Sequence, residues 1–351
     1  MNKIMYMLNY VGNGGTENYV FHLMNAIGPE NCVLVYSEVG PGIDRFKSLN
    51  IKMYQVHMNH PFDIKAAKAI KTIIRNEKID IVHAQFLREN YIAILAKLIG
   101  ARIKVIWTYH VDVPMNSTLQ LLNRMMTSYN KAVITVSKFM ENQITNKGVS
   151  KKVVKLIYNG IQEPSKQRND TSSKTPVLSV IGRFTEEKGH AFLLESLAYI
   201  QREHPELQWQ CNLFGEGPLM EELKNSSREL GMDERVHFKG HVSNKDEMYV
   251  NTDIVVLPSN NDALPYVGIE AIAYGIPVIG TNVGGIPEIV VDGETGYIVN
   301  YGDTKQLAEK IVFLIQNHDI YKMFSENGKR HFHKLFTETN MIDKTIHVYN
   351  S

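Results

Sequence analysis

One glycine-flanked segment of this sequence contains two cationic side chains whose types and spacing suit a defined chemistry. Arg183 and Lys188 lie five positions apart between Gly182 and Gly189, directly after a short apolar run. A guanidinium and an ammonium on one loop can bind one diphosphate, because both donate charge-assisted hydrogen bonds to phosphate oxygens. Taken alone, the same pair is also typical of a solvated loop.

Two carboxylates follow in a second segment, again after an apolar run. Asp262 lies in a polar loop, and Glu270 lies eight positions later, where the pattern after Pro265 predicts a short helix. Carboxylates suit hydroxyl-rich ligands, since each accepts hydrogen bonds from neighbouring hydroxyl groups. The backbone amides of Val267 and Gly268, at the start of that helix, suit a phosphate.

The first half of the chain offers weaker candidates. Gly14 and Gly15 separate the first apolar run from a helical pattern, where glycine lets backbone amides approach a phosphate. Their spacing differs from that of the dinucleotide-binding fingerprint. His110 ends another apolar run, a place where a lone histidine is more often structural. Asp112 lies two positions later without a second acid, so this segment predicts no metal site.

The elements that must position these residues are short strands. Apolar runs rich in Val, Ile and Tyr alternate with helical patterns along the chain, which is typical of parallel α/β sheets. The expected strands lie at 3–10, 31–37, 51–56, 80–86, 104–110, 132–137, 177–184, 209–217, 236–240, 253–259, 277–282 and 296–300. Ligands bind outside the carboxyl ends of such strands, so the chemistry is expected just after each run.

Composition restricts the class of protein. The chain has 351 residues, 44% of them hydrophobic and 21% charged, which excludes a disordered, collagen-like or coiled-coil protein. Two distant cysteines favour a reducing compartment over a disulfide framework. No uncharged apolar run reaches the roughly 18 residues of a membrane span, so we expect a cytoplasmic protein.

Charge divides the chain into two parts. Residues 1–165 carry nine more basic than acidic side chains, and residues 166–351 carry eight more acidic than basic ones. The basic part could meet an anionic surface, or the two parts could complement each other. No groove-reading or stacking motif accompanies the basic residues, so we expect no nucleic-acid partner.

Ten segments, taken together and in order, resemble the retaining GT-B glycosyltransferases of the GT4 type. These enzymes transfer sugars from nucleoside diphosphate donors. The matching segments are GGTE (14–17), DIVHAQ (80–85), TYH (108–110), VSK (136–138), IYNGI (157–161), GRFTEEKG (182–189), FGEGP (214–218), VHFKGHV (236–242), the stretch 258–270, and GGIPEIVVDGETG (284–296).

The resemblance implies an architecture of two Rossmann-like, doubly wound α/β domains facing each other across a cleft. We expect an acceptor-side domain at 1–164, a polar linker at 165–176 and a nucleotide-sugar-binding domain at 177–329. A last helix at 330–351 would cross back to the first domain.

The resemblance also implies how the donor phosphates are held. Arg183 and Lys188 would bind the diphosphate and stabilise the charge on the leaving group. The backbone amides of Tyr266, Val267 and Gly268 would cradle the phosphates. The family works without a metal, so no metal and no cofactor are expected, and the donor would be linked to UDP or GDP.

The remaining implied roles concern sugars and the first domain. Glu270 would bind the ribose hydroxyls, and Asp262 would contact the donor sugar. Asp262 departs from the family, which usually has glutamate there, so sugar preference is open to change. Gly14 and Gly15 would close on the donor from the other domain, and His110 would lie near the donor sugar and the reacting face.

The expected reaction is transfer of a hexosyl or N-acetylhexosaminyl group with retention, by front-side attack in which a donor phosphate accepts the acceptor's proton. The acceptor would be a saccharide or lipid-linked molecule of a cell-surface polysaccharide or glycolipid. Two alternatives remain: a nucleoside-diphosphate-sugar epimerase of the same architecture, and a non-catalytic nucleotide-sugar sensor.

A basic stripe predicts contact with an anionic membrane on the inner face. Lysine and arginine recur at helical spacing, at positions 65, 68, 71, 75 and 78, opposite Ala69, Ile70, Ile73 and Ile74. A second apolar cluster, Leu119, Leu121, Leu122, Met125 and Met126, follows His110 and could be core or a wall for a lipid-linked acceptor. An ordinary solvated helix over a sheet explains the stripe equally well.

Overall fold

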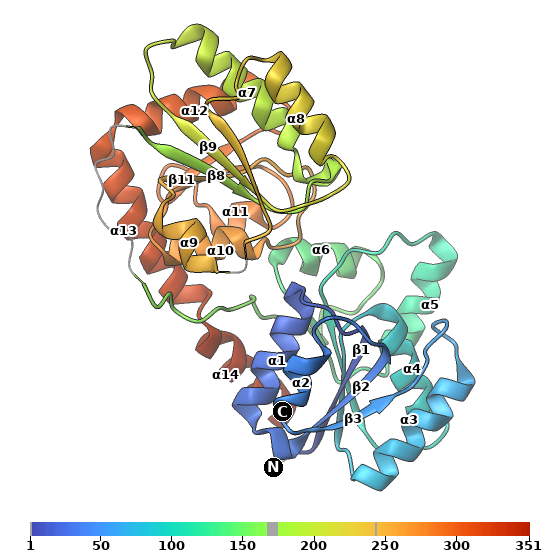
Figure 1. Ribbon diagram of the computed structural model, residues 1–351. Helices are drawn as coiled ribbons and strands as arrows, with labels where there is room; N and C mark the ends of the chain where they lie inside the picture. The colour runs from blue at the N-terminus through green and yellow to red at the C-terminus, as the bar shows by residue number, and fades with distance from the viewer. Residues whose placement is uncertain (1, 167–174, 243) are drawn as a thin grey trace. The chain divides into compact units, whose positions relative to one another are not determined.

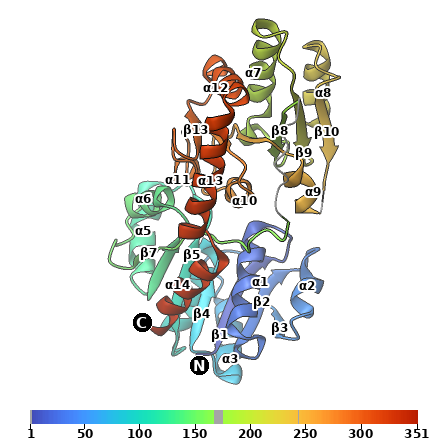
Figure 2. The same ribbon diagram turned by 90° about the vertical axis from the view of Figure 1, so that its left-hand side faces the viewer.

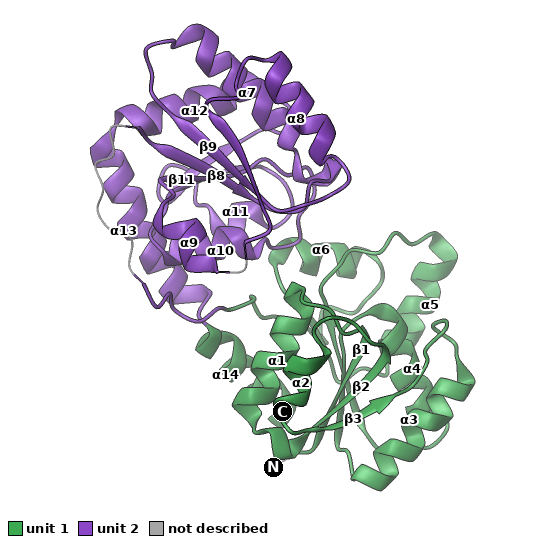
Figure 3. Ribbon diagram, in the orientation of Figure 1, with its two compact units in different colours: residues 1–160, 338–351 green, residues 161–337 purple. Residues whose placement is uncertain are grey.

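The computed structural model describes residues 2–166, 175–242 and 244–351. They form two compact units, residues 1–160 with 338–351 (unit 1) and residues 161–337 (unit 2), coloured separately in Figure 3. The unit boundary at 160/161 lies four residues before the expected end of the first domain. Most of the predicted linker, residues 167–174, lies outside the described residues.

Unit 1 is built on a seven-stranded parallel sheet with the order β3-β2-β1-β4-β5-β6-β7 (Figure 1). Its strands are β1 (Ile4–Tyr10), β2 (Cys32–Glu38), β3 (Lys52–Gln55), β4 (Ile81–Ala84), β5 (Lys104–Tyr109), β6 (Ala132–Thr135) and β7 (Val154–Leu156). Six of these strands were predicted from the apolar runs. The sequence analysis missed β7, because three residues are too short to show a pattern.

Helices bury both faces of this sheet, which is why its strands are apolar on both sides. They are α1 (Gly15–Ile27), α2 (Ile43–Lys47), α3 (Ile64–Glu77), α4 (Leu87–Leu98), α5 (Ser117–Thr127), α6 (Lys138–Asn146) and α14 (Glu338–Asn350). Alternate residues of β1 belong to two separate apolar cores. Tyr6 packs with α1, α2 and α14, whereas Met5 and Met7 pack with α3 and α4.

Unit 2 is a six-stranded parallel sheet with the order β10-β9-β8-β11-β12-β13. Its strands are β8 (Val177–Ile181), β9 (Gln210–Phe214), β10 (Val236–Gly240), β11 (Ile254–Leu257), β12 (Val278–Thr281) and β13 (Gly296–Val299). Its helices are α7 (His190–Glu203), α8 (Met220–Glu229), α9 (Lys245–Val250), α10 (Tyr266–Ala273), α11 (Ile286–Ile289), α12 (Thr304–Gln316) and α13 (His318–Leu335). Both units are Rossmann-like, as the sequence predicted.

The C-terminal helix α14 returns to unit 1 and lies beside its sheet, as Figure 2 shows. Its Met341, Val348 and Tyr349 are buried in the core that contains α1. The sequence analysis expected one helix from residue 330, whereas α13 runs to Leu335 and α14 begins at Glu338.

A buried polar network holds α14 in place. The Tyr349 hydroxyl lies 2.6 Å from Nδ1 of His83 on β4 and 3.0 Å from the Tyr6 hydroxyl on β1. Nε2 of His83 lies 2.7 Å from the Thr108 hydroxyl on β5. Burial, together with His110, lowers the pKa of His83 to about 3, so the ring is neutral and both nitrogens have partners.

We predict that Tyr349→Phe lowers the stability of unit 1 by about 1–3 kcal/mol, because it leaves buried polar groups of His83 and Tyr6 unpaired. Urea denaturation measures the loss. Tyr301→Phe, which changes an exposed tyrosine of unit 2, serves as the matched control and should leave stability unchanged. Equal stability of the two variants would contradict the role of the network.

Candidate functional site

The strand order of unit 2 reverses between β8 and β11, and both donor-binding candidate loops begin there. β8 pairs with β11 through Leu178↔Ile254 and Ser179↔Val255, so the two carboxyl ends lie side by side. Residues 182–189 leave one strand, and residues 258–265 leave the other. Ligands of open α/β sheets bind at such a reversal.

Lys188 and Asp262 meet at this point. The Lys188 ammonium lies 2.6 Å from Oδ2 of Asp262, and both side chains are largely buried, at 25% and 15% exposure. Arg183 lies apart from this pair: its side chain is 76% exposed, and its guanidinium contacts the Glu187 carboxylate at 3.3 Å. The structure therefore joins two of the predicted residues and leaves Arg183 on the surface, paired with Glu187.

Close backbone contacts fix both loops. Gly189 has φ 66°, and a Cβ there would lie 1.9 Å from the carbonyl oxygen of Pro258. Gly284 has φ 58°, and a Cβ there would lie 1.7 Å from the carbonyl oxygen of Asp262. Only glycine suits either position. The amide of Gly285 also donates to the Asp262 carbonyl at 2.9 Å, so the segment after β12 holds the loop that carries Asp262.

A small cavity of about 20 Å³ lies between the two loops. Lys188, Asp262, Pro265 and Val267 line it together with the ends of β8 and β11. This volume holds about one water molecule. A diphosphate would therefore have to bind at the mouth of the cavity, where Lys188 and the start of α10 face the same space.

The start of α10 is only partly available to a phosphate. No side chain caps it, since Pro265 occupies the N-cap position. The amide of Gly268 already donates to the Pro265 carbonyl at 3.1 Å. Among the three predicted amides, Val267 is the one whose residue lines the cavity.

Glu270 is buried on α10 and has two partners that the sequence analysis missed. Its Oε2 accepts from the Tyr249 hydroxyl at 2.6 Å, and its Oε1 forms an ion pair with the Lys245 ammonium. The Tyr249 ring in turn stacks on Tyr274, with centroids 4.9 Å apart. No sequence signal links Lys245 to Glu270, because they lie 25 positions apart on different helices.

The other candidates belong to unit 1. Gly14 is the N-cap of α1 and Gly15 its first residue, and no side chain caps this helix. The Glu17 carboxylate, in the first turn of α1, accepts from the Gly12 amide at 3.3 Å, so the helix and the loop before it are joined by this hydrogen bond. Both glycines follow the carboxyl end of β1, where the strand order of this sheet reverses.

His110 follows β5 at the same edge of the unit 1 sheet. Its Nε2 lies 3.0 Å from Oε1 of Gln85, and its ring meets the Tyr19 ring edge-on at 5.1 Å. Burial lowers its pKa to about 3, so the imidazole is neutral near pH 7. Because Oε1 only accepts, Nε2 carries the hydrogen and Nδ1 keeps the lone pair.

A pocket of about 520 Å³ opens beside His110. Its walls are mainly aromatic and aliphatic, and they include Phe86, Trp107 and Tyr109. It lies at the carboxyl ends of β1, β4 and β5, the place at which the strand order predicts a ligand. Neither Gly14 nor Gly15 lines it.

Glu89 also lines this pocket and was not singled out from the sequence. It is fully buried on α4, and neither carboxyl oxygen has a hydrogen-bond partner in the part of the chain that the structure describes. Burial raises its pKa to about 7. The indole nitrogen of Trp107, in the same pocket, likewise has no partner among the described residues.

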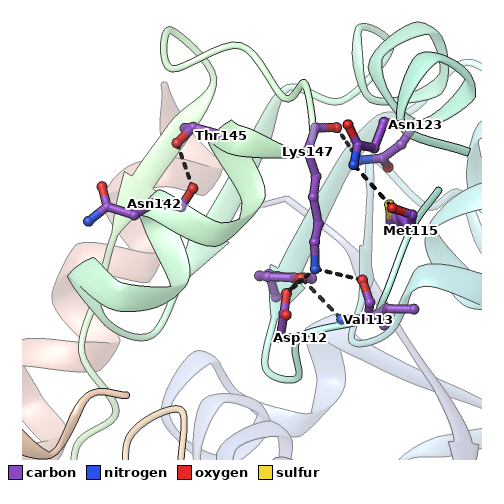
Figure 4. A network of polar contacts seen from close by, with 9 residues as sticks. Asp112, Val113, Met115, Asn123, Asn142, Thr145 and Lys147 are labelled. Atoms are coloured by element: carbon purple, nitrogen blue, oxygen red, sulfur yellow. Dashed lines mark hydrogen bonds and ion pairs between the residues drawn. The ribbon is translucent and has the colours of Figure 1, made fainter. Parts of the chain in front are cut away.

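The loop after His110 is held by an ion pair (Figure 4). The Lys147 ammonium contacts the Asp112 carboxylate and donates to the Val113 carbonyl at 2.6 Å. The Tyr109 hydroxyl donates to the same carboxylate and accepts from the Val113 amide at 3.2 Å. Asp112 therefore has a structural partner. Within the described residues, no three histidine, cysteine, aspartate or glutamate side chains converge.

The predicted basic stripe lies on α3 and on its C-cap residue, Lys78. The apolar side of this helix, with Ile70, Ile73 and Ile74, is buried in the core of unit 1 and is not available to a membrane. Lys65, Lys68, Arg75 and Lys78 are exposed, as are Leu119, Leu121 and Met125 of the second apolar cluster. Contact with an anionic surface stays a prediction. Across residues 2–166, 175–242 and 244–351, none of the helices has the length and hydropathy to span a membrane.

Two protein families match the two units. Residues 13–163 match the family described as Glycosyltransferase Family 4, and residues 161–331 match Glycosyl transferases group 1. The second match contains Arg183, Lys188, Asp262 and Glu270. Both families are glycosyltransferases, so the match does not favour the epimerase or the sensor.

Curated relatives agree with these matches. The chain is 27% identical over 319 residues to the N-acetyl-alpha-D-glucosaminyl L-malate synthase of Bacillus anthracis, covering 87% of this chain and 83% of that enzyme. It is 30% identical over 236 residues to CapM of Staphylococcus aureus, a capsular polysaccharide biosynthesis glycosyltransferase, covering 64% and 60%.

Solved structures share the fold along the whole chain. A glycosyltransferase from Rickettsia africae superposes with a TM-score of 0.87 at 22% identity, covering 99% of this chain and 98% of that one. Anabaena HepE in complex with UDP and glucose superposes with a TM-score of 0.85 at 18% identity, covering 100% of both chains.

The unpartnered carboxyl of Glu89 predicts an unusual dependence of stability on pH. The unfolded pKa is near 4.5 and the folded pKa about 7, so the protonated form is favoured in the folded state. Burial of the ionised form therefore costs stability as pH rises through this window, by about 3 kcal/mol above pH 7. Glu89→Gln should stabilise the protein by that amount at pH 8 and far less at pH 4, measured by urea denaturation.

Glu77→Gln is the matched control, because this buried carboxylate of the same unit is paired with Lys52, Tyr54 and Lys3. These partners, Lys52 first, lower the pKa of Glu77 to about 2. The ionised Glu77 carboxylate therefore stabilises the fold fully above pH 4.5, and this stabilisation is lost as pH falls toward 2. Glu77→Gln should therefore destabilise the protein more at pH 8 than at pH 4. An effect of Glu89→Gln on stability that does not change with pH would contradict the raised pKa of Glu89.

Proposed function

The chain belongs to the group 1 glycosyltransferases with a GT-B fold, and from that premise we propose that it transfers a sugar from a nucleoside diphosphate donor, with retention and without a metal. The observation that carries the proposal is the pair of loops at the ends of β8 and β11, which brings Lys188, Asp262 and the start of α10 to one cavity.

Lys188 can bind a donor phosphate without releasing Asp262. An ammonium has three hydrogen-bond donors, and Asp262 takes one of them at 2.6 Å. The Arg183 side chain is exposed, so its guanidinium is accessible to the second phosphate. Together with the Val267 amide, these groups would neutralise the charge that develops on the leaving diphosphate.

Glu270 and Asp262 supply different acceptors in this proposal. Each carboxylate oxygen accepts about two hydrogen bonds, so Glu270 can still accept from ribose hydroxyls while it holds Tyr249 and Lys245. Asp262, at the mouth of the cavity, would contact the donor sugar. Both carboxylates are already engaged by lysines, which suits hydrogen bonding better than covalent attack on the anomeric carbon.

For the acceptor we propose a saccharide or lipid-linked molecule of a cell-surface polysaccharide or glycolipid. The similarity to CapM supports a polysaccharide. The similarity to the N-acetyl-alpha-D-glucosaminyl L-malate synthase of Bacillus anthracis supports transfer of an N-acetylglucosaminyl group, so the donor would carry a hexosyl or N-acetylhexosaminyl group. The structure of Anabaena HepE with UDP supports a UDP-linked donor over a GDP-linked one.

We predict that Lys188→Ala and Arg183→Ala each lower turnover by about 100- to 1,000-fold, the usual effect of losing one donor to a developing negative charge. Release of the nucleoside diphosphate from UDP- and GDP-sugars measures turnover. Lys224→Ala is the matched control, since Lys224 pairs with Glu221 on α8, far along the chain from either loop. Near-normal turnover of the Lys188 variant with an intact fold would remove the diphosphate assignment.

Glu270 and Asp262 should separate nucleotide binding from transfer. Glu270→Gln loses a charge-assisted hydrogen bond to ribose, so affinity for the nucleoside diphosphate should fall about ten-fold or more. Asp262→Asn should leave that affinity nearly unchanged while transfer collapses. Asp262→Glu, which lengthens the side chain by one methylene, should keep some activity and change sugar preference.

Calorimetry with UDP and GDP, set beside a transfer assay, measures both properties in each variant. Equal loss of nucleotide affinity in the Glu270 and Asp262 variants would refute the division of roles. The two carboxylates would then support their loops instead.

A further inference from the structure

The Glu270 carboxylate on α10 has two partners of different kinds. Glu270 is 6% exposed, and the other residues of this helix are uncharged. Its Oε2 accepts from the Tyr249 hydroxyl at 2.6 Å, and its Oε1 pairs with the Lys245 ammonium. Tyr249 is fully buried, whereas the Lys245 side chain is 56% exposed. Oε2 is therefore held in the interior, and Oε1 is the oxygen whose partner reaches solvent.

Glu270 lies on the same side of α10 as a residue of the donor-side cavity. Val267 lines that cavity, and Glu270 follows it by three positions on the helix. Residues three positions apart lie on one face of an α-helix, about one turn from each other. One turn is about 5.4 Å long, so the ribose of a nucleoside diphosphate bound at the mouth of the cavity can reach Glu270.

We propose that Tyr249 is a positioning residue, which holds Oε2 of Glu270 so that Oε1 accepts from a ribose hydroxyl, and which thereby favours donors that carry both ribose hydroxyls. The inference rests on the proposed function, in which Glu270 binds the ribose. A carboxylate with one oxygen fixed has lost its rotational freedom on folding. It does not lose that freedom again when the nucleotide binds.

Contacts within unit 2 fix the Tyr249 ring in turn. The ring stacks on Tyr274, with centroids 4.9 Å apart and an angle of 19° between the planes. The Tyr274 hydroxyl donates to the Asp246 carboxylate on α9. Burial, followed by the nearby Glu270 carboxylate, raises the pKa of Tyr249 well above its ordinary value. The Tyr249 hydroxyl therefore stays protonated and donates to Oε2.

Lys245 compensates the charge of Glu270 without fixing its direction. Its ammonium is a point charge on a flexible stem, with three donors that rotate. Because the side chain is half-exposed, water and salt screen its attraction to Oε1. A ribose hydroxyl can therefore share Oε1 with Lys245, while Oε2 stays bound to Tyr249.

Calorimetry on the full chain, with UDP and GDP and with their 2′,3′-dideoxy forms, tests the inference. The dideoxy forms keep the base and the diphosphate, so the ratio of the two affinities isolates the contact with the ribose hydroxyls. We expect Tyr249→Phe to weaken binding of the hydroxyl-bearing nucleotide about five-fold or more and to leave binding of the dideoxy form unchanged. Phenylalanine keeps the ring that stacks on Tyr274, and urea denaturation checks that the variant is folded.

Tyr274→Phe is the matched control, since it removes a tyrosine hydroxyl that is bonded to a carboxylate other than Glu270. Its affinity ratio should equal that of the unaltered protein. Glu270→Asp keeps the charge but shortens the side chain by one methylene, so it should lower the ratio as Tyr249→Phe does.

Three results would overturn the inference. They are equal weakening of both nucleotide forms by Tyr249→Phe, an equal fall of the ratio in the Tyr274 variant, and an unchanged ratio in Glu270→Asp. The first would mean that Tyr249 only supports the fold, the second that its hydroxyl has no special effect, and the third that the charge of residue 270 suffices without a fixed position.

Glu270→Gln distinguishes failure of this inference from failure of the function on which it rests. A ratio that Glu270→Gln lowers and Tyr249→Phe does not would overturn this inference and leave the ribose-binding role of Glu270 intact. A ratio that neither variant lowers would overturn that role and the inference with it. Sugar transfer by the same protein would then leave the glycosyltransferase function intact.

Discussion

Parallel pairing of β8 with β11 is the constraint on which the donor-side geometry depends. The register places the ends of two strands from distant parts of the chain side by side, and a loop that carries charged residues follows each end. Gly189 touches the Pro258 carbonyl and Gly284 touches the Asp262 carbonyl so closely that any side chain would clash. The ion pair between Lys188 and Asp262 is a consequence of this backbone packing, since neither loop alone brings the two charges together.

Unit 1 shows how the surroundings of a buried acid determine its chemistry. Glu77 and Glu89 are the same residue type, both buried, and twelve positions apart in one unit. Three partners hold the pKa of Glu77 near 2, whereas burial raises that of Glu89 to about 7, against the smaller opposing effects of its own backbone amide and of Arg88. The first acid stabilises the sheet, because its charge is compensated. The second costs stability when it is ionised, because its charge is not compensated in this way.

The sequence supported a detailed interpretation where the relevant information is local. Apolar runs predicted every strand except β7, and the ends of these runs marked the loops that follow β8 and β11. Arg183, Lys188 and Asp262 were found this way, since each lies just after a strand. The partners of Glu270 were not found, because Lys245 and Tyr249 belong to another helix with no motif of its own.

What the sequence by itself determined is the order of elements, the two parallel sheets and the loops that carry charge, because strand periodicity and glycine placement are properties of short segments. Only the tertiary structure decided which of those groups have partners. Tyr349 reaches His83 across 266 positions of chain, and Glu89 lines a pocket to which residues of β1 and β5 also contribute. Hydrogen bonding and desolvation depend on which groups are neighbours in space. Folding determines these neighbours, and the order of residues in the sequence does not show them.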